Sequence, residues 1–116
     1  MNNLGIYYGA TILNETDLLE ANIKSKIELE YYGTQEIKNK QTYYGISIVK
    51  KEHYIDKIRF EKNAVDRVST NESVVSKIIE TLKKFKVTPI ALNDVLDDLL
   101  KLPEYQNKEL IEDNAS

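Results

Sequence analysis

The stretch from Val68 to Leu102 constrains the fold more than any other, because it has the pattern of two amphipathic helices joined by a tight corner. Ser69 and Glu72 fit a capping box, in which a hydroxyl and an acid three positions later bond to each other's free backbone N–H groups. Apolar residues then recur at helical spacing within a stripe roughly 140° wide, the width of a surface that faces a core. They are Val74, Val75, Ile78, Ile79, Leu82 and Phe85.

The second helix is predicted to begin at Thr88-Pro89, since threonine can cap a helix and proline at its first position gives up an N–H that has no partner there. Pro103 is predicted to end it. So short a link makes the two helices turn sharply and pack on a common surface. The apolar stripe of the second helix consists of Leu92, Val95, Leu96, Leu99, Leu100 and Leu102.

Three segments before these helices alternate between apolar and polar residues, as half-buried strands do. They run from Asn22 to Tyr32, from Thr42 to Lys50 and roughly from Tyr54 to Glu61. In the first, Ile27, Leu29 and Tyr31 share one face. In the third, Tyr54, Ile58 and Phe60 do the same. The polar segment 33–41 is expected to link the first two strands, and residues 50–53 are expected to form the next turn.

Strands followed by helices predict an α+β fold, a three- or four-stranded antiparallel meander with a C-terminal helical hairpin packed on one face. The number of strands stays open because residues 1–20 are ambiguous, with a short strand around Ile6 and a helical turn at 17–20 as alternatives. The other face is expected to be polar and basic. Residues 1–103 are expected to form a single domain, and residues 104–116 a tail that is either a short helix or disordered.

The tripeptide Tyr-Tyr-Gly occurs three times, at 7–9, 31–33 and 43–45, with flanks too different for a structural repeat. In a strand, such a pair directs one ring to each face of the sheet. The glycine that follows suggests a bulge or the close approach of another backbone. Most of these rings are expected to pack in the core or across strands, and the outward ones are candidates for binding.

Composition indicates an ordinary folded chain of 116 residues, with 41% hydrophobic and 30% charged residues. No segment approaches the ~18 apolar residues of a membrane span, and no signal peptide pattern opens the chain. The absence of cysteine fits a reducing compartment, so we expect a cytoplasmic protein. The net charge of −3 combines a basic middle, +5 over residues 21–86, with −3 over residues 1–20 and −5 over residues 87–116.

Several loose motifs lie between Tyr44 and Leu99. They are Tyr44-Gly45-Ile46-Ser47-Ile48, Val68-Ser69-Thr70, and Val87-Thr88-Pro89-Ile90-Ala91-Leu92, followed by Asp94-Val95 and Asp97-Asp98. In these the chain resembles a clostridial (Firmicutes) family of short proteins known only as a domain of unknown function. That family often has a histidine before the leucine of the proline turn, where this sequence has Ala91. The resemblance implies a small α+β domain and implies no activity.

The sequence offers no recognisable catalytic arrangement. His53, the only histidine, lies in a charged segment without a nucleophile or acid at a catalytic spacing, so we expect a solvated turn residue. One histidine and no cysteine argue against a zinc site. The four glycines are isolated, which argues against a phosphate-binding loop. We therefore expect neither an enzyme nor a cofactor.

Asp94, Asp97 and Asp98 share the face of the second helix that lies opposite the leucines. The simplest interpretation is a solvated face. Carboxylates at this spacing can also form an acidic docking strip for a basic partner or, less in keeping with the pattern, bind a hard cation.

These features favour a small non-enzymatic interaction module, a regulatory or adaptor protein that binds another protein and no membrane. Asp94, Asp97 and Asp98, together with the outward rings of Tyr32 and Tyr43, are the candidate partner contacts. A homo-oligomer joined through an exposed sheet edge is a further expectation, because an unpaired strand invites another strand.

The alternative is a nucleic-acid-binding protein. Residues 21–86 are net basic, and a sheet face could offer tyrosines for base stacking beside cations. The residues in question are Tyr32, Tyr43 and Tyr54 with Lys24, Lys26 and Arg59. The acidic total, with a sequence pI of about 5.2, argues against this alternative.

Overall fold

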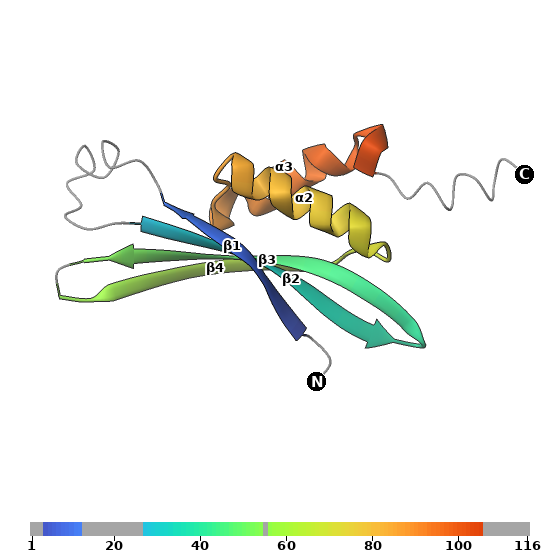
Figure 1. The fold of residues 1–116 in the computed structure, drawn as a ribbon, viewed down its shortest axis with the longest axis horizontal. Helices are drawn as coiled ribbons and strands as arrows, with labels where there is room; N and C mark the ends of the chain where they lie inside the picture. The colour runs from blue at the N-terminus through green and yellow to red at the C-terminus, as the bar shows by residue number, and fades with distance from the viewer. Residues whose placement is uncertain (1–3, 13–26, 55, 106–116) are drawn as a thin grey trace, which may run out of the picture.

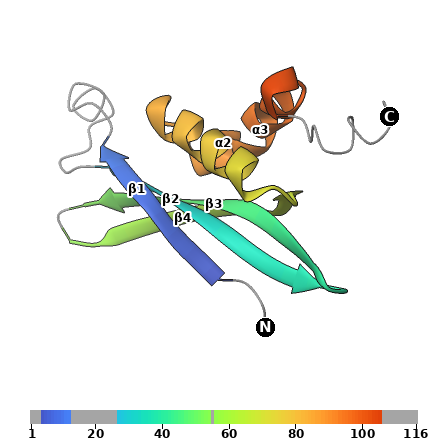
Figure 2. The same ribbon diagram turned by 45° about the vertical axis from the view of Figure 1, so that its right-hand side comes forward.

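The structure is a computed structural model, and it describes residues 4–12, 27–54 and 56–105. Four strands form one antiparallel sheet in sequential order, β1 (Leu4–Ile12), β2 (Ile27–Lys38), β3 (Gln41–His53) and β4 (Ile58–Ser69). The helical part follows as α2 (Glu72–Lys84), the short 3-10 helix η1 (Pro89–Ala91), α3 (Leu92–Leu100) and the 3-10 turn η2 (Pro103–Tyr105). Both helices lie on one face of the sheet (Figures 1 and 2). The predicted α+β fold is confirmed, with four strands in the meander.

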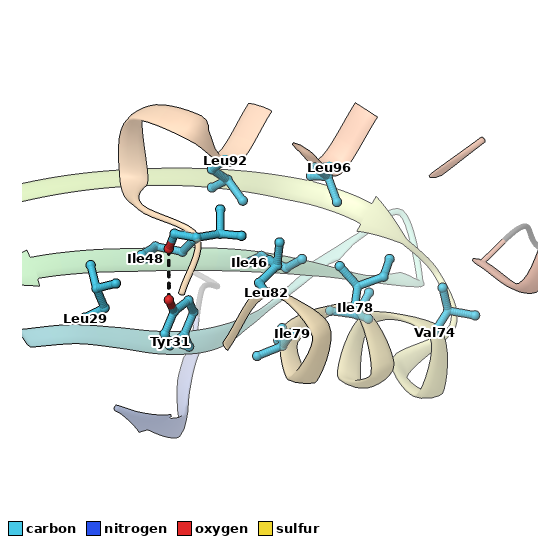
Figure 3. Packing of buried hydrophobic residues seen from close by; sticks show 12 residues of the cluster. Leu29, Tyr31, Ile46, Ile48, Val74, Ile78, Ile79, Leu82, Leu92 and Leu96 are labelled. Atoms are coloured by element: carbon cyan, nitrogen blue, oxygen red, sulfur yellow. Dashed lines mark hydrogen bonds between the residues drawn. The ribbon is translucent and has the colours of Figure 1, made fainter. Parts of the chain in front are cut away.

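The core lies between α2, α3 and the inner face of β2 and β3. Ile78, Ile79 and Leu82 of α2 are fully buried, as are Ile46 and Ile48 of β3 (Figure 3). Both apolar stripes supply this core, which also contains Leu29, Tyr31, Val74, Val75, Val87, Leu92 and Leu96. Each large aliphatic side chain buried in this way stabilises the fold by roughly 1.5–3 kcal/mol.

The predicted stripes extend one residue too far at their ends. Phe85 is 68% exposed because it is the C-cap of α2, where the backbone leaves the helix and Lys86 takes a positive φ of 55°. Leu102 is 41% exposed because α3 already ends at Leu100. Apolar spacing continued past both helix ends, but the helical backbone did not.

The predicted capping box is wrong. Ser69 is still part of β4, opposite Tyr44, so the helix cannot begin there. Asn71 is the N-cap, and its Oδ1 accepts a hydrogen bond of 3.0 Å from the backbone N–H of Ser73. The Ser69 hydroxyl oxygen instead accepts a 3.0 Å bond from the N–H of Asn71, which stabilises the turn from strand to helix.

The predicted link between the first two strands is also wrong. β2 continues to Lys38 and β3 begins at Gln41, so the connection has only two residues. Asn39 and Lys40 adopt φ values of 52° and 66°, the pair of positive angles that a tight type I′ hairpin requires. The polar residues from Thr34 to Lys38 pair with β3 rather than forming a loop.

The predicted turn at residues 50–53 belongs to β3 instead. The connection to β4 comes after His53, where the N–H of Tyr54 donates to the carbonyl of Lys57 at 2.8 Å. β4 then starts at Ile58, later than expected. The shared face of Ile58 and Phe60 is the one without helices, where these side chains are 50% and 61% exposed.

Each Tyr-Tyr pair directs one ring to each face, as predicted. Tyr8, Tyr31 and Tyr44 belong to or pack against the core cluster, whereas the register of the strands puts their neighbours on the opposite side. The glycines after two pairs allow close approaches. A Cβ on Gly33 would lie 2.6 Å from the ring carbon Cε1 of Tyr8. A Cβ on Gly45 would meet backbone oxygens of β4, at a register shift beside this residue.

Tyr31 ties the sheet to the segment between the helices. Its ring is fully buried, and its hydroxyl donates a 2.9 Å hydrogen bond to the carbonyl of Val87 (Figure 3). Replacing it with phenylalanine leaves that buried carbonyl without its donor, so we expect a loss of about 1–2 kcal/mol at neutral pH. Chemical denaturation of Tyr31→Phe measures this, with the exposed Tyr7→Phe as the control that stays unchanged.

The buried hydroxyl of Tyr31 also makes the stability of the fold depend on pH. Burial raises the pKa of the Tyr31 hydroxyl from 10.0 to about 12. The unfolded chain therefore releases this proton at a lower pH than the folded protein does. The contribution of Tyr31 to the free energy of unfolding is complete below pH 10 and is lost as pH rises through about 12. An alkaline denaturation series should show this loss in the wild type and a smaller one in Tyr31→Phe.

After α3, η2 brings the chain back to α2, where the hydroxyls of Tyr105 and Thr81 lie 2.9 Å apart. The predicted helical turn at 17–20, the start of the first predicted strand and the tail from residue 106 lie outside the described residues. Within the described ranges, no helix is long and apolar enough to cross a membrane.

Candidate functional site

The sheet face opposite the helices has no covering layer among the residues that the structure describes (Figure 2). We call it the open face. At its centre Tyr32 of β2 lies opposite Ser47 of β3, and Ser47 lies opposite Ala64 of β4. One level further along the strands, Gly5 of β1 lies opposite Thr34 of β2, and Thr34 lies opposite Gly45 of β3. Small side chains from four strands therefore meet at the middle of the sheet.

A shallow trough of about 530 Å³ crosses the open face at this level. Its lining includes the small residues Gly5, Thr34, Ser47 and Ala64, and the larger ones are Glu30, Tyr32, Val49, Lys51, Lys62 and Asp66. Ser47, only 5% exposed, is the buried polar residue of this group. The trough exists because residues of little volume come together from separate strands.

One wall of the trough is formed by Glu30 and the two residues that contact its carboxylate, Tyr32 and Lys51, which we call the Glu30 cluster. The carboxylate of Glu30 accepts a 2.9 Å hydrogen bond from the hydroxyl of Tyr32 and lies 3.0 Å from the ammonium of Lys51. Burial and then the bond to Glu30 raise the pKa of Tyr32. A hydrogen bond to the same carboxylate stabilises the protonated form of Lys51 and so raises its pKa. The ring of Tyr7 lies 5.5 Å from that of Tyr32, so two aromatic rings lie side by side at this wall.

A second cluster lies beyond the trough, around Tyr43. Arg67 binds Glu36 through two contacts, Nε to Oε1 at 3.0 Å and a terminal nitrogen to Oε2 at 3.3 Å. Its guanidinium also lies 5.2 Å from the centre of the Tyr43 ring. These hydrogen bonds lower the pKa of Glu36 and raise that of Arg67. Thr34 and Gly45 lie between this cluster and the Glu30 cluster along the strands.

The prediction that this face is basic is wrong for the described residues. Glu28, Glu30 and Glu36 all lie on it, and each contacts a cation or a histidine. One expected cation points the other way, because Arg59 lies opposite Glu52, whose partner Ile27 is on the inner face of the sheet. Lys24 and Lys26 lie outside the described residues. The open face is therefore a mixed surface of ion pairs and rings.

His53 lies at the end of β3 and not in a turn. Its Nε2 is 2.7 Å from Oε1 of Glu28 across the β2–β3 pair. This contact joins two strands on the open face, beyond the Lys51 wall of the trough.

The predicted site residues fall into two separate groups. Tyr32 and Tyr43 lie on the open face, as expected for outward rings. Asp94, Asp97 and Asp98 are exposed on α3, in the helical layer on the other side of the sheet (Figure 1). One flat partner surface cannot contact both groups. No group of three or more metal-ligating side chains forms within the described residues, so these aspartates do not constitute such a cluster.

Sequence reasoning missed the trough itself. Gly5, Thr34, Ser47 and Ala64 come from different strands, and only the register of the pairing brings them together. The one available indication was the glycine of the Tyr-Tyr-Gly motifs: Gly33 follows Tyr32 directly, and Gly45 lies two residues after Tyr43.

Comparison with known proteins identifies the family and nothing closer. No curated protein and no solved structure matches this chain. A family model described as a family of unknown function, DUF6514, matches residues 10–102, which span all four strands in part or whole and both helices. That match covers most of the 116 residues, so this chain belongs to the DUF6514 family of unknown function.

Proposed function

We propose that this protein is a small non-enzymatic interaction module that receives another protein on the open face of its sheet. The observation that carries the proposal is the trough across that face, with a floor of small side chains beside the rings of Tyr32 and Tyr7. Protein interfaces favour concave surfaces with rigid aromatic side chains, because such rings contribute contact area with little loss of conformational freedom.

Exposed apolar side chains support a binding role for this face. Tyr7 is 57% exposed on β1, and Ile58 and Phe60 are 50% and 61% exposed on β4. They lie on the open face on either side of the trough. Exposed apolar groups rimmed by polar residues are typical of interaction sites.

The charges favour a protein over a nucleic acid as the partner. Three carboxylates of β2 are matched by Lys51, His53 and Arg67, so the face does not present the excess of cations that binds phosphates. Among the charged residues that line the trough, Lys62 and Asp66 are in no ion pair within the described ranges. A carboxylate or backbone carbonyl of the partner would complement Lys62, and a cation or N–H of the partner would complement Asp66.

Filling the trough should abolish binding. Ala64 is exposed in β4, so Ala64→Arg adds a long side chain above the trough floor without entering the core. We expect affinity purification from native cells to recover a stoichiometric partner with the wild type and none with Ala64→Arg. The melting temperature should stay close to that of the wild type, because exposed positions typically change stability by about 0.5 kcal/mol or less.

Ile90→Arg is the matched control. Ile90 is 81% exposed on η1, in the helical layer, so an arginine at this position adds the same guanidinium away from the open face. It should recover the same partner as the wild type. Equal recovery by Ala64→Arg, or loss only in Ile90→Arg, would remove the open face from consideration.

The second candidate function is nucleic-acid binding, favoured by the rings of Tyr7, Tyr32 and Tyr43 on one sheet face. Titration with a random oligonucleotide over a range of salt concentrations distinguishes the two. A protein-binding module should give a slope near zero in log K against log salt. A steep negative slope, lost in Tyr32→Ala, would replace the proposal by this one.

The proposal includes a regulatory or adaptor role in the cytoplasm of a bacterium, with the clostridial origin that the sequence motifs suggest, and no cofactor. The composition supports this setting, since the chain contains no cysteine.

A further inference from the structure

The two edges of the sheet differ in their protection against pairing with another strand. β1 and β4 are the edge strands. β4 carries Arg59, Glu61, Lys62, Asp66 and Arg67, and such charges are a common device that keeps edges apart. β1 has the sequence LGIYYGATI, with no charged residue and no proline in nine positions. The edge strand β1 therefore has no charged residue of its own, whereas β4 has five.

Apolar side chains flank the β1 edge on both faces of the sheet. Ile6 lies opposite Gly33 on the helix side and is 47% exposed. Tyr7 and Ile12 lie opposite Tyr32 and Glu28 on the open face and are 57% and 48% exposed. A strand placed beside β1 would cover apolar groups above and below the new hydrogen bonds.

The bulge in β1 does not close this edge. The register shifts between Tyr7 and Gly9, and Tyr8 turns toward α2, where its hydroxyl lies 2.9 Å from that of Ser76. The ammonium of Lys83 donates a 3.2 Å hydrogen bond to the carbonyl of Tyr8. The carbonyl of Tyr8 at the bulge thus has a hydrogen-bond donor from α2. β1 continues on both sides of the bulge.

We propose that β1 pairs antiparallel with β1 of a second copy of this chain, forming a dimer with one continuous eight-stranded sheet. The second copy fits this edge because an uncharged strand meets itself without placing like charges opposite each other. Nine residues give a seam roughly 30 Å long. The flanking isoleucines and Tyr7 of both copies supply the apolar contact that strand pairing alone lacks.

The symmetry of this pairing has a consequence for the open face. Antiparallel pairing of identical strands implies a two-fold axis perpendicular to the sheet, so the helices of both copies lie on one side. The two open faces then join on the other side, with the Tyr7–Tyr32 ring pairs nearest the axis. The dimer rests on the edge alone and does not depend on the proposed partner of the trough.

The test is the molar mass of the purified protein by light scattering after size exclusion, over a range of micromolar concentrations. We expect the wild type to give twice the 13.4 kDa of one chain. Ile6→Lys and Ile12→Lys, at the two ends of β1, should each give the monomer mass, because they place a charge at the seam. Thermal melting of each variant shows that it remains folded.

Ile58→Lys is the matched control, since Ile58 is an isoleucine of similar exposure, 50%, on the charged edge β4. It should remain dimeric. A monomeric wild type, or a dimer that survives both β1 substitutions, would overturn the inference. Dimer formation through β4, seen as a monomer only in Ile58→Lys, would overturn it as well. None of these results bears on the partner captured through the trough.

Discussion

Replacing Ile78 by aspartate is expected to unfold the protein. Ile78 is fully buried at the centre of the layer between α2 and the sheet, where no cation lies among its core neighbours (Figure 3). A carboxylate there loses the apolar burial and has no hydrogen-bonding partner, which together cost more than about 4 kcal/mol. Domains of this size have a total stability on the order of 5–15 kcal/mol, so a loss of this size removes most of the stability at the lower end of that range and lowers the melting temperature sharply.

The measurement is thermal unfolding followed by circular dichroism. Lys77→Asp is the matched control, because Lys77 is the preceding residue of α2 and is exposed. It should melt close to the wild type. If Ile78→Asp kept the wild-type melting temperature, the assignment of the core to the inner stripe of α2 would be wrong.

Adding a single methyl group at Gly45 is the second change with a large expected effect. A Cβ there would clash with the carbonyl of Val65 and would lie 2.6 Å from the carbonyl of Asp66 and 2.5 Å from the hydroxyl of Thr34. Two of these three atoms are backbone, so they cannot move without disturbing the pairing of β3 with β4. We expect Gly45→Ala to destabilise the fold by about 3 kcal/mol, at the upper end for overpacking.

Gly5→Ala provides the comparison, since nothing lies within 4 Å of a Cβ built on Gly5. Both substitutions add the same atom to the open face of the same sheet. Urea denaturation should show a marked loss for Gly45→Ala and a change of about 0.5 kcal/mol or less for Gly5→Ala. Equal stability of the two variants would contradict the close approach of β4 over Gly45.

The parts of the fold that follow from periodicity could be predicted from the sequence. The stripe through Ile78 and the alternation through Leu29 and Tyr31 identified buried faces, because burial of a helix or strand imposes its own repeat on the sequence. The ends of elements could not be predicted in the same way. The apolar spacing at Phe85 and the hydroxyl at Ser69 fit a helix locally, but the backbone path set by the sheet decided otherwise.

The β2–β3 hairpin shows why the loops were harder. Residues from Thr34 to Lys38 are mostly polar, which is typical of a loop, yet they form strand because pairing with β3 satisfies their backbone. Asn39 and Lys40 adopt positive φ angles without the Asn-Gly sequence that usually indicates this turn.

The candidate site was less predictable than the fold. The outward direction of Tyr32 and Tyr43 followed from the alternation of strand residues, so these two rings could be placed on one face. The trough between them depends on Thr34, Ser47 and Ala64, whose meeting is decided by the register of three strands. Charge counts along the chain failed for a related reason, because neighbouring residues such as Lys50 and Lys51 point to opposite faces.

Site-specific crosslinking tests the central claim most directly, namely that the partner sits on the open face. The chain contains no cysteine, so a single introduced thiol can carry a photoactivatable label at one known place. Lys62→Cys puts the label at the trough, and Asp97→Cys puts it on the acidic surface of α3. In native cell extract, we predict a crosslink from position 62 to a stoichiometric protein partner and none to that partner from position 97. A crosslink from position 97 alone, or from neither position, would contradict the account.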